Sequence, residues 1–566
     1  MSFSRSLHLQ LRRQLAQPTT TIALCVMGLL VGVLAAAVIV VFRLGILWLG
    51  NSIGNHSQWQ QFMPNGWRFG VPIAAAAVIY LLMMVTRYRR FRLGIPFVIH
   101  RMKQHYGMLP WRSTVNQFFA GIIALTAGFS VGREGPAVHL GAAISTWFGH
   151  RLQVPYNSIR TLAACGIAAA IACSFGTPLA AMVLVMEVVL REYKVHIFIP
   201  VMLAAVSGAL ITREVFGTAT DLAMLVPEPL TPMQLPWVVM LGILLGLVGV
   251  LFKALMLDMM RTAKHTHVLT RFLFAGLMTG ALGLIIPAGL GPGLTAIHQV
   301  IVHQQELNIL FTLLFAKLIT SAIALGMGIP GGLIGAVFGI GAIVAALFTA
   351  SLASLGLHTP LPLDIFLLLG MAGLLTATIH APLAALLAVM ELSRSPEVIV
   401  PAMLVIVTAY LISSQLFKSK SIFIAQLDLQ ELPYQISPVT LALQKTGIEA
   451  VMDRDYMLLK QPTHEQITDA LQNADTQSVI IQSYDAEQQP LYHIVSYDIM
   501  ASDASESSLN YTPLTGLKIN VTLSEAYDIL APQRRGAVYI YDESPTDIIG
   551  VVSWDMVRKA LDRELP

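Results

Sequence analysis

The stretch "AGFSVGREGPAVHLGAA", residues 127–143, places Arg133 and Glu134 side by side within a long run of small and apolar residues. An ionisable side chain at the centre of a bilayer costs about 2 to 3 kcal/mol or more, so such a residue indicates a functional site. A structural ion pair between the two residues at a membrane–water boundary is the alternative explanation. The glycines and the proline around the pair favour the first explanation.

Gly132 and Gly135 let backbone amides approach a ligand closely, and Pro136 suits the first turn of a helix. The free N–H groups and the positive dipole end of that helix attract an anion. An ionised Glu134 competes with the anion for this place, whereas a protonated or displaced Glu134 leaves it open. The sequence therefore predicts an anion gate that responds to pH, anion concentration and voltage through one side chain.

The composition fits a protein of the membrane. Of the 566 residues, 55% are hydrophobic and 12% are charged, whereas about 25% are charged in an ordinary soluble protein. Residues 1–427 hold 26 Lys and Arg against 11 Asp and Glu, a net charge of +15, and the remaining residues hold 9 against 21, a net charge of −12. We predict a polytopic α-helical membrane protein followed by an acidic α/β domain, whose charge argues against binding nucleic acid or anionic lipid.

Long stretches without charged residues predict the membrane-spanning segments. No charged residue lies between Arg13 and Arg43, a stretch longer than the roughly 20 residues that a spanning helix needs. Arginine clusters before this span and after the next one predict cytoplasmic segments. We therefore expect a multi-pass protein of the plasma or inner membrane with both chain ends in the cytoplasm. Apolar helical segments are expected near 21–42, 70–86, 115–131, 158–190, 196–212, 235–257, 270–289, 308–352, 363–392 and 398–417.

The membrane part contains an internal repeat. "FGTPLAAMVLVMEVVL" at 175–190 and "IHAPLAALLAVMELSR" at 379–394 share Pro-Leu-Ala-Ala and Val-Met-Glu at the same internal spacing. The glycine-rich breaks "VGREGP" at 131–136 and "MGIPGG" at 327–332 stand at a similar offset. Paired breaks of this kind are typical of transporters built from structural repeats, in which they mark the binding site.

After residue 426 the sequence becomes polar and rich in short β-strand patterns. Helical patterns at 463–474 and 522–533 each precede a pair of predicted strands, which indicates two copies of one small α/β unit. The predicted organisation is a short N-terminal segment, a transport domain with two repeats and a C-terminal pair of units. The N-terminal segment is predicted at 1–19. The transport domain is predicted at 20–430, with repeats near 20–215 and 235–430. The C-terminal pair is predicted at 431–566, with units near 445–503 and 510–566.

"GREGP" at 132–136 resembles the external gate motif of the CLC chloride channels and chloride/proton antiporters. The order of motifs extends this resemblance over residues 20–430, and the tail resembles the pair of CBS domains that many members carry. The resemblance implies a homodimer in the lipid bilayer with one anion path in each subunit, built from inverted repeats, and chloride, other small anions and in some members protons as cargo. It makes Glu134 the gating glutamate, with Arg133 and Gly135 beside the anion.

The first anion-binding motif of the family, usually Gly-Ser-Gly-Ile-Pro, reads "RLGIP" in this chain. Gly94, Ile95 and Pro96 match it, while Leu93 stands at the serine position. The tyrosine that usually closes the inner site corresponds to Phe423. The chain therefore lacks both hydroxyl groups of the family's central site.

The motif usually written Gly-x-Phe-x-Pro reads "GLIGA" at 332–336. The resemblance places Leu333, Ile334 and Gly335 where backbone amides face the anion. A dehydrated anion must recover its lost hydrogen bonds, and these amides and the helix dipoles would have to supply them. We expect a weaker central site and less selective anion binding than in a typical member.

Antiporters of the family commonly carry a second glutamate on the helix that begins "PLAA", and Val188 stands at its position. Glu187 is adjacent, but on a helix it points about 100° away. A structural pairing of Glu187 with Arg191 at i+4 is expected, and Glu391 has Arg394 at i+3. These departures favour a voltage- or pH-gated chloride channel; the alternative is a chloride/proton antiporter with a non-standard inner proton path.

Other function classes have less support. A CBS-linked cation transporter needs clustered oxygen ligands, and the few acids of the membrane part lie mostly outside its apolar segments. No metal-binding or nucleophile–base motif accompanies Glu134, so we expect neither an enzyme nor a metal site. CBS pairs often bind adenine nucleotides through an acid three residues after Ser or Thr, whereas Asp498 and Asp555 follow Ser496 and Ser553 by two. A dimerising role of the tail is the alternative to nucleotide binding.

Overall fold

The computed structural model describes residues 12–19, 21–54, 64–88, 92–217, 225–302, 306–356, 361–473, 478–484, 490–497 and 509–564. Within these ranges, nine helices are long and apolar enough to cross a membrane. The chain folds into two compact units. One, which we call the membrane unit, comprises Cys25–Phe148 and Thr161–Tyr434; the other, the C-terminal unit, comprises Gln435–Pro566 together with Met1–Leu24 and Gly149–Arg160.

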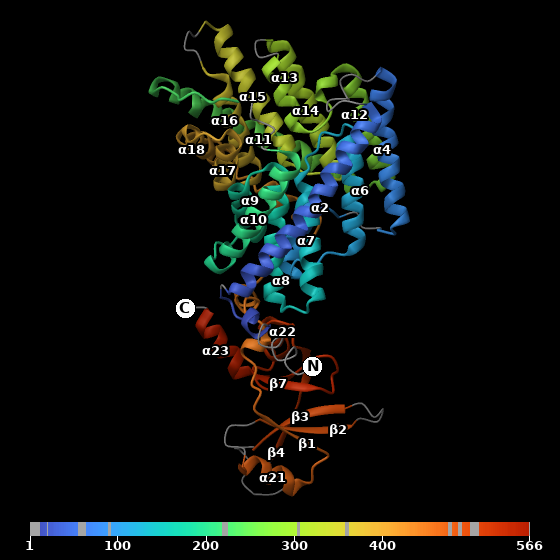
Figure 1. The fold of residues 1–566 in the computed structure, drawn as a ribbon, viewed down its shortest axis with the longest axis vertical. Coiled ribbons are helices and arrows are strands. Elements are labelled where there is room, and N and C mark those ends of the chain that lie inside the picture. Colours follow the sequence, from blue (N-terminus) through green and yellow to red (C-terminus); the bar gives the residue numbers. More distant parts are fainter. Residues whose placement is uncertain are drawn as a thin grey trace. The chain divides into compact units, whose positions relative to one another are not determined.

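The first half of the helical region carries the helices drawn from blue to green in Figure 1. Its elements are α2 (Ile22–Gly54), α4 (Asn65–Val85), α5 (Gly94–Gln104), α6 (Trp111–Thr126), α7 (Glu134–Arg151), α8 (Tyr156–Phe175), α9 (Pro178–Leu184), the π-helix η1 (Val185–Leu190) and α10 (Val195–Phe216). The segment predicted as helical at 158–190 is divided because Gly176 adopts a left-handed backbone with φ +73°. Pro178 then begins the next helix, where its missing N–H costs nothing.

The second half repeats this order. Its elements are α11 (Leu235–Lys264), α12 (Val268–Ile285), α13 (Gly293–Val302), α14 (Leu307–Met327), α15 (Ile334–Ser354), α16 (Leu363–Ile379), α17 (Pro382–Ser393), α18 (Ile399–Tyr410), the π-helix η5 (Leu411–Leu416) and α19 (Ile422–Leu429). The single segment expected at 308–352 is wrong, because Gly328 in the left-handed region ends α14 before α15 begins. The expected segment at 363–392 is likewise divided at His380, φ +61°.

Equivalent helices of the two halves pack by the same close approach. A Cβ on Gly141 of α7 would overlap the carbonyl of Gly166 in α8, and a Cβ on Gly341 of α15 would overlap that of Gly370 in α16. Small residues at such contacts let helix backbones approach closely within a membrane. The repeat read from the sequence is therefore present in the packing as well.

The two halves are inverted with respect to each other where α9 and α17 meet. Glu187, after α9, accepts hydrogen bonds from the amides of Leu383 and Ala384 at the start of α17, at 3.3 and 2.9 Å. Glu391, near the end of α17, accepts hydrogen bonds from the amides of Leu179 and Ala180 at the start of α9, at 3.0 and 2.9 Å. Since each carboxylate caps the N-terminus of the other helix, the two segments run antiparallel.

The C-terminal unit contains the same β-α-β-β arrangement twice. In the first copy β1 (Tyr456–Lys460) pairs parallel with β2 (Ser478–Tyr484), which pairs antiparallel with β3 (Pro490–Tyr497), and β4 (Leu509–Pro513) joins the edge. In the second copy β5 (Thr515–Lys518) pairs parallel with β6 (Ala537–Tyr541), which pairs antiparallel with β7 (Ile548–Ser553). The C-terminal region is thus an α/β region with two sheets, and its strands β1, β4 and β5 were not revealed by the sequence.

The helices of this unit include two at the predicted positions, near 463–474 and 522–533. The helices are α20 (Pro438–Leu443), the 3-10 turn η6 (Ile448–Ala450), α21 (His464–Asn473), α22 (Leu523–Leu530) and α23 (Trp554–Glu564). Thr522 caps α22 and forms a capping box with Glu525. The core of the second copy consists of apolar side chains of α20, α22, α23 and the strands β6 and β7.

Candidate functional site

The two glycine-rich breaks bond to each other. The N–H of Gly132 donates to the carbonyl of Gly332 and the N–H of Gly332 donates to the carbonyl of Gly132, both at 2.7 Å. A Cβ on either residue would overlap the Glu134 carboxyl group where it now lies, so glycine at these two positions leaves the space that the carboxyl group occupies. The pairing brings the N-termini of α7 and α15 together, one from each half of the helical region.

Glu134 is the first residue of α7, but its side chain caps the partner helix. Its carboxylate is fully buried, and Oε1 accepts a hydrogen bond from the N–H of Gly335 at 2.9 Å. Among the described residues, Oε2 has no hydrogen-bond partner. The carboxylate thus occupies the end of α15 where free amides and the helix dipole attract an anion.

The neighbours of Glu134 differ in their placement. Gly135 lies against the backbone of Gly331, where a side chain would overlap the Gly331 carbonyl. The guanidinium of Arg133 lies over the ring of Phe175, 4.9 Å from its centroid. Arg133 is therefore beside the site in sequence but interacts with α8 in space.

A cavity of about 450 Å³ in the membrane unit brings together four of the eight predicted anion-binding residues and the two inner-gate positions, Leu93 and Phe423. From the start of α5 it is lined by Leu93, Gly94, Ile95 and Pro96; from the break before α15 by Gly331, Gly332 and Leu333; and from α19 by Phe423. Ile334 and Gly335 are not among its lining residues; Gly335 instead bonds Glu134. Segments far apart in the sequence thus converge on one space.

Basic side chains dominate the charge of this cavity. Arg92, Lys264 and Arg271 line it together with one acid, Glu431. Lys264 pairs with Glu431 at 2.6 Å, which leaves a net positive lining. Concave surfaces of one sign raise the local concentration of oppositely charged ions. Sequence reasoning missed Lys264 and Arg271, since cations at span ends are also explained by membrane topology.

The start of α5 has an unexpected partner. Gly94 adopts φ +74°, and its N–H donates to Oε1 of the buried Gln117 at 3.1 Å. Leu93, at the N-cap, makes no side-chain capping bond. The Gln117 side-chain oxygen therefore satisfies the N–H of the first residue of α5. No sequence signal distinguished Gln117 from other polar residues of α6.

Glu187 and Val188 lie together at a second, smaller cavity. This cavity, about 260 Å³, is lined by both residues and by His380, Tyr410 and Phe423, among others. The expected pair of Glu187 with Arg191 is wrong, because both carboxylate oxygens accept backbone N–H groups of α17. Both residues belong to the π-helix η1, whose wider turn makes the angle between adjacent side chains somewhat smaller than 100°, so Glu187 and Val188 still point in different directions.

The acids considered for nucleotide binding give no assembled site. Asp555 is the second residue of α23 and lies 3.5 Å from Arg558 in an exposed ion pair. Asp498 lies outside the described residues. In the described part of the chain, no group of three or more His, Cys, Asp and Glu side chains could hold a metal ion.

Two inverted helix breaks that meet around a buried carboxylate, beside a positively charged cavity, define a membrane transport protein for anions. The family model described as voltage-gated chloride channel matches residues 74–414. The chain belongs to this CLC family and is a multi-pass membrane protein that transports anions; it is not an enzyme.

Named relatives cover most of the chain. It is 27% identical over 419 residues to the H⁺/Cl⁻ exchange transporter ClcA of Vibrio parahaemolyticus, covering 70% of this chain and 88% of the relative. A similar match, 27% over 428 residues, covers 72% of this chain and 90% of ClcA of Vibrio vulnificus.

Solved structures share the fold. A slow cyanobacterial Cl⁻/H⁺ antiporter matches with a TM-score of 0.64 at 21% identity, over 72% of this chain and 98% of its own. A eukaryotic CLC transporter matches with a TM-score of 0.60 at 18% identity, over 94% of this chain and 97% of its own. The second match includes the C-terminal region, so the likeness of fold is not confined to the membrane unit.

Proposed function

We propose that the protein exchanges chloride for protons, with Glu134 as the group that binds both in turn. The buried Glu134 carboxylate at the N-terminus of α15 is the observation that carries this proposal. An ionised carboxylate and an anion compete for the same amides, and protonation removes the carboxylate's charge. One side chain can then alternate between holding a proton and admitting an anion.

This proposal of chloride/proton exchange replaces the chloride channel that Val188 and Phe423 favour in the sequence. The curated relatives that cover most of the chain are named H⁺/Cl⁻ exchange transporters. Val188 supplies no inner carboxylate, so protons would enter by another route, and the smaller cavity beside Val188 and Phe423 offers space for water. Passive, voltage-gated chloride flux is the competing outcome of the experiment below.

The anion would be held mainly by the backbone. Leu93 and Phe423 provide no hydroxyl, and the Gly94 N–H is taken by Gln117. The amides at 333–335 and the dipoles of α5 and α15 are then the donors at hand, with Arg92, Lys264 and Arg271 raising the local anion concentration. We expect modest selectivity among small anions as a result.

We further propose that the C-terminal unit is a pair of CBS domains. The duplicated β-α-β-β topology supports this assignment. We also propose a homodimer, from the family resemblance, and cytoplasmic chain ends, from the arginine clusters at the ends of the first spans. For the C-terminal unit, a dimerising role and the binding of an adenine nucleotide are the two alternatives. Addition of adenine nucleotides to the flux assay tests the last of these.

The test uses purified protein in liposomes loaded with high chloride and suspended in weakly buffered solution of low chloride. With valinomycin present, an exchanger shows chloride efflux together with proton uptake into the liposomes, before any protonophore is added. Glu134→Gln should abolish the proton movement and leave chloride flux. Glu397→Gln, an exposed acid of the membrane unit, is the matched control and should behave like the wild type. Chloride efflux without proton movement in the wild type would establish a channel instead.

A further inference from the structure

A buried lysine lies against a histidine in the second half of the membrane unit. Lys253 belongs to α11, one of the helices long and apolar enough to cross a membrane, and is only 3% exposed. Its Nζ lies 3.4 Å from Nε2 of His380, the residue that ends α16. We call these two residues the lysine–histidine pair. The sequence does not reveal the pair, because its members are 127 positions apart.

The hydrogen-bond acceptors around Lys253 are neutral. Its ammonium donates to the Ala377 carbonyl and to Ser413 Oγ, both at 2.8 Å, and to Ser419 Oγ. None of its partners among the described residues is a carboxylate. A buried positive charge without a counter-charge is costly, and an ionisable residue inside a membrane indicates a function. The hydrogen bonds fix Nζ in position, but only a group that takes its proton removes the charge.

His380 is such a group, and its two ring nitrogens have different surroundings. Nε2 lies near Lys253 and 3.4 Å from Ser413 Oγ, whereas Nδ1 makes no hydrogen bond with the described residues. The ring packs edge-on against Tyr410, with centroids 5.4 Å apart, and His380 lines the smaller cavity of about 260 Å³. Since one water molecule takes about 30 Å³ in the liquid, this cavity has room for several beside the histidine.

Other charged side chains face the same cavity. Arg191, Glu187 and Lys420 line it together with His380. Glu187 is held by two amides of α17, and Lys420 pairs with Asp428 at 2.7 Å. Arg191 adds a positive charge, which disfavours a second positive charge on the lysine–histidine pair. The pair therefore carries one positive charge at most.

The geometry allows the pair to take up and release one proton. In the neutral pair, the Nε2–H of His380 donates to the amine of Lys253. A hydronium ion in the cavity protonates Nδ1 and becomes water, and the Nε2 proton then passes to Nζ. The product is an ammonium that donates to a neutral ring protonated at Nδ1. The reverse steps return the proton to water in the cavity.

The smaller cavity adjoins the anion cavity. Phe423 lines both of them, so the two spaces meet at its side chain. The larger cavity is also lined by Gly332, where a Cβ would overlap the Glu134 carboxyl group. All of these residues belong to the membrane unit. Water in the two cavities therefore connects the lysine–histidine pair to the backbone that packs against Glu134.

We propose that the lysine–histidine pair is a second proton-binding site, which exchanges protons between water in the smaller cavity and Glu134. The pair takes the place of the carboxylate that Val188 does not supply. The proposal rests on the proposed function, chloride/proton exchange, and names the residues that carry the proton where that function left the route open.

The experiment records chloride efflux and proton uptake together in liposomes. It compares His380→Asn with the matched control His298→Asn, which changes an exposed histidine of α13. Asparagine tolerates the left-handed backbone of His380, φ +61°, but binds no proton. Because a positioned proton-transfer group contributes about 100-fold or more, His380→Asn should lower proton uptake per chloride at least about tenfold while chloride efflux continues. An unchanged ratio would overturn the proposal.

Lys253→Met tests whether the two residues act together. Methionine has a similar length but no ammonium, so proton uptake per chloride should fall about as far as in His380→Asn. The double variant should show no further loss, because either single change already removes the shared proton. Losses that multiply in the double variant would overturn the pair.

Two milder variants serve if the first ones fail to fold. His380→Gly suits the left-handed backbone, and Lys253→Arg keeps the positive charge but releases no proton. Both should lower proton uptake per chloride in the same way. A lower temperature of thermal unfolding together with the wild-type ratio would overturn the proposal, because the pair would then only stabilise the fold.

The outcomes distinguish this inference from the proposed function. A wild type that moves chloride without protons overturns the exchange and the second proton site together. Proton movement that is lost in Glu134→Gln but kept in His380→Asn overturns the second site alone. Loss of proton movement with continued chloride efflux in both variants, and not in His298→Asn, supports both proposals.

Discussion

Three glutamates of the membrane unit cap the N-terminus of a helix from the other half of the molecule, but their surroundings differ. Glu187 and Glu391 are partly exposed and each accepts two backbone N–H groups. Glu134 is fully buried: Gly335 donates to its Oε1, and among the described residues its Oε2 has no hydrogen-bond partner. A buried charge is costly where it is not fully hydrogen-bonded, so Glu134 is the carboxylate whose charge a proton can most readily neutralise. Capping of a helix N-terminus by a carboxylate is thus structural for Glu187 and Glu391, at α17 and α9, and forms a gate for Glu134, at α15.

The largest expected effect comes from Glu134→Gln. The amide keeps the shape but cannot ionise, so proton uptake should fall to the level of protein-free liposomes and chloride flux should lose its pH dependence. Simultaneous recording of chloride and pH measures both quantities. Proton coupling that survived in this variant would remove the distinction between Glu134 and the two structural caps, Glu187 and Glu391.

Gly132→Ala should disturb the gate sterically. The added Cβ overlaps the Glu134 carboxyl group, and overpacking of this kind costs about 1 to 3 kcal/mol. The carboxylate is expected to leave its position at Gly335, which raises chloride flux at high pH. Gly70→Ala, in α4 with open space around it, is the control and should leave flux unchanged. Equal behaviour of the two variants would contradict the placement of Glu134.

Glu187→Ala and Glu391→Ala test whether these two glutamates are structural helix caps. Each change removes a helix cap and should lower the free energy of unfolding by about 1 kcal/mol, within the usual range of 0.5 to 2. Thermal unfolding in detergent measures the loss, and the flux assay should show that chloride and proton movement remain coupled. Loss of coupling in Glu187→Ala alone would make Glu187 part of a proton path and break its equivalence to Glu391.

The smallest expected effect is a gain at the start of α5. Leu93→Ser adds a hydroxyl beside the anion cavity, and one hydrogen bond contributes about 0.5 to 1.5 kcal/mol net, or about 2- to 10-fold in affinity. Isothermal titration with chloride measures the gain. Since Gln117 already satisfies the Gly94 N–H, the new hydroxyl is free to reach an anion. Unchanged affinity would count against the alignment of Leu93.

The sequence predicts the features that depend on residue type at a fixed spacing. Uncharged length predicts the spans, the two "PLAA" segments predict the repeat, and glycines around Glu134 predict a close backbone approach. It does not predict which helix end a carboxylate reaches. Glu187 has Arg191 at the correct spacing for an ion pair. Its carboxylate oxygens instead accept hydrogen bonds from two backbone N–H groups at the start of α17, because these donors are already fixed in position at a helix end.

Long-range contacts explain the remaining differences. Gln117, Lys264 and Arg271 contribute to the site only because segments far apart in the chain converge there. The helices α5 and α13 escape prediction because they are short and begin at glycines. Arg12 reads as a topology signal in the sequence, and its burial depends on residues more than 400 positions later.

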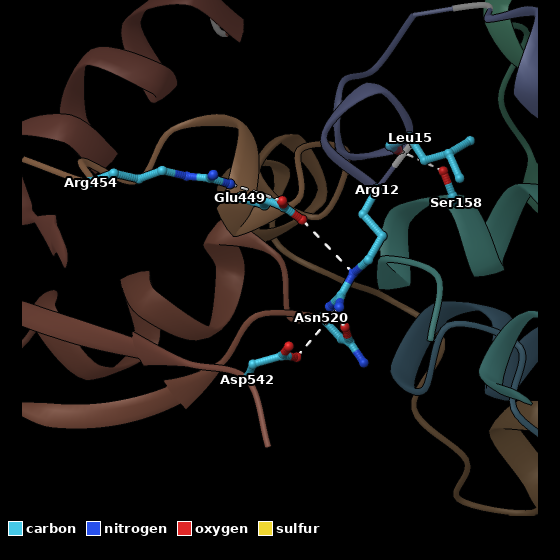
Figure 2. A network of polar contacts seen from close by, with 7 residues as sticks. All are labelled: Arg12, Leu15, Ser158, Glu449, Arg454, Asn520 and Asp542. Carbon is cyan, nitrogen blue, oxygen red and sulfur yellow. Dashed lines mark hydrogen bonds and ion pairs between the residues drawn. The ribbon is translucent and has the colours of Figure 1, made fainter. Parts of the chain in front are cut away.

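The burial of Arg12 in the C-terminal unit has a consequence for biosynthesis. Its guanidinium lies against Glu449, Asn520 and Asp542 (Figure 2). The N-terminus of a chain leaves the ribosome first, so Arg12 and residues 149–160 emerge long before these three residues exist. The Leu15 carbonyl can bond Ser158 early, whereas Arg12 lacks its partners until the last part of the chain is made. Burial of Arg12 is therefore a late event in assembly, and a chain truncated before residue 449 would leave its guanidinium without these acceptors.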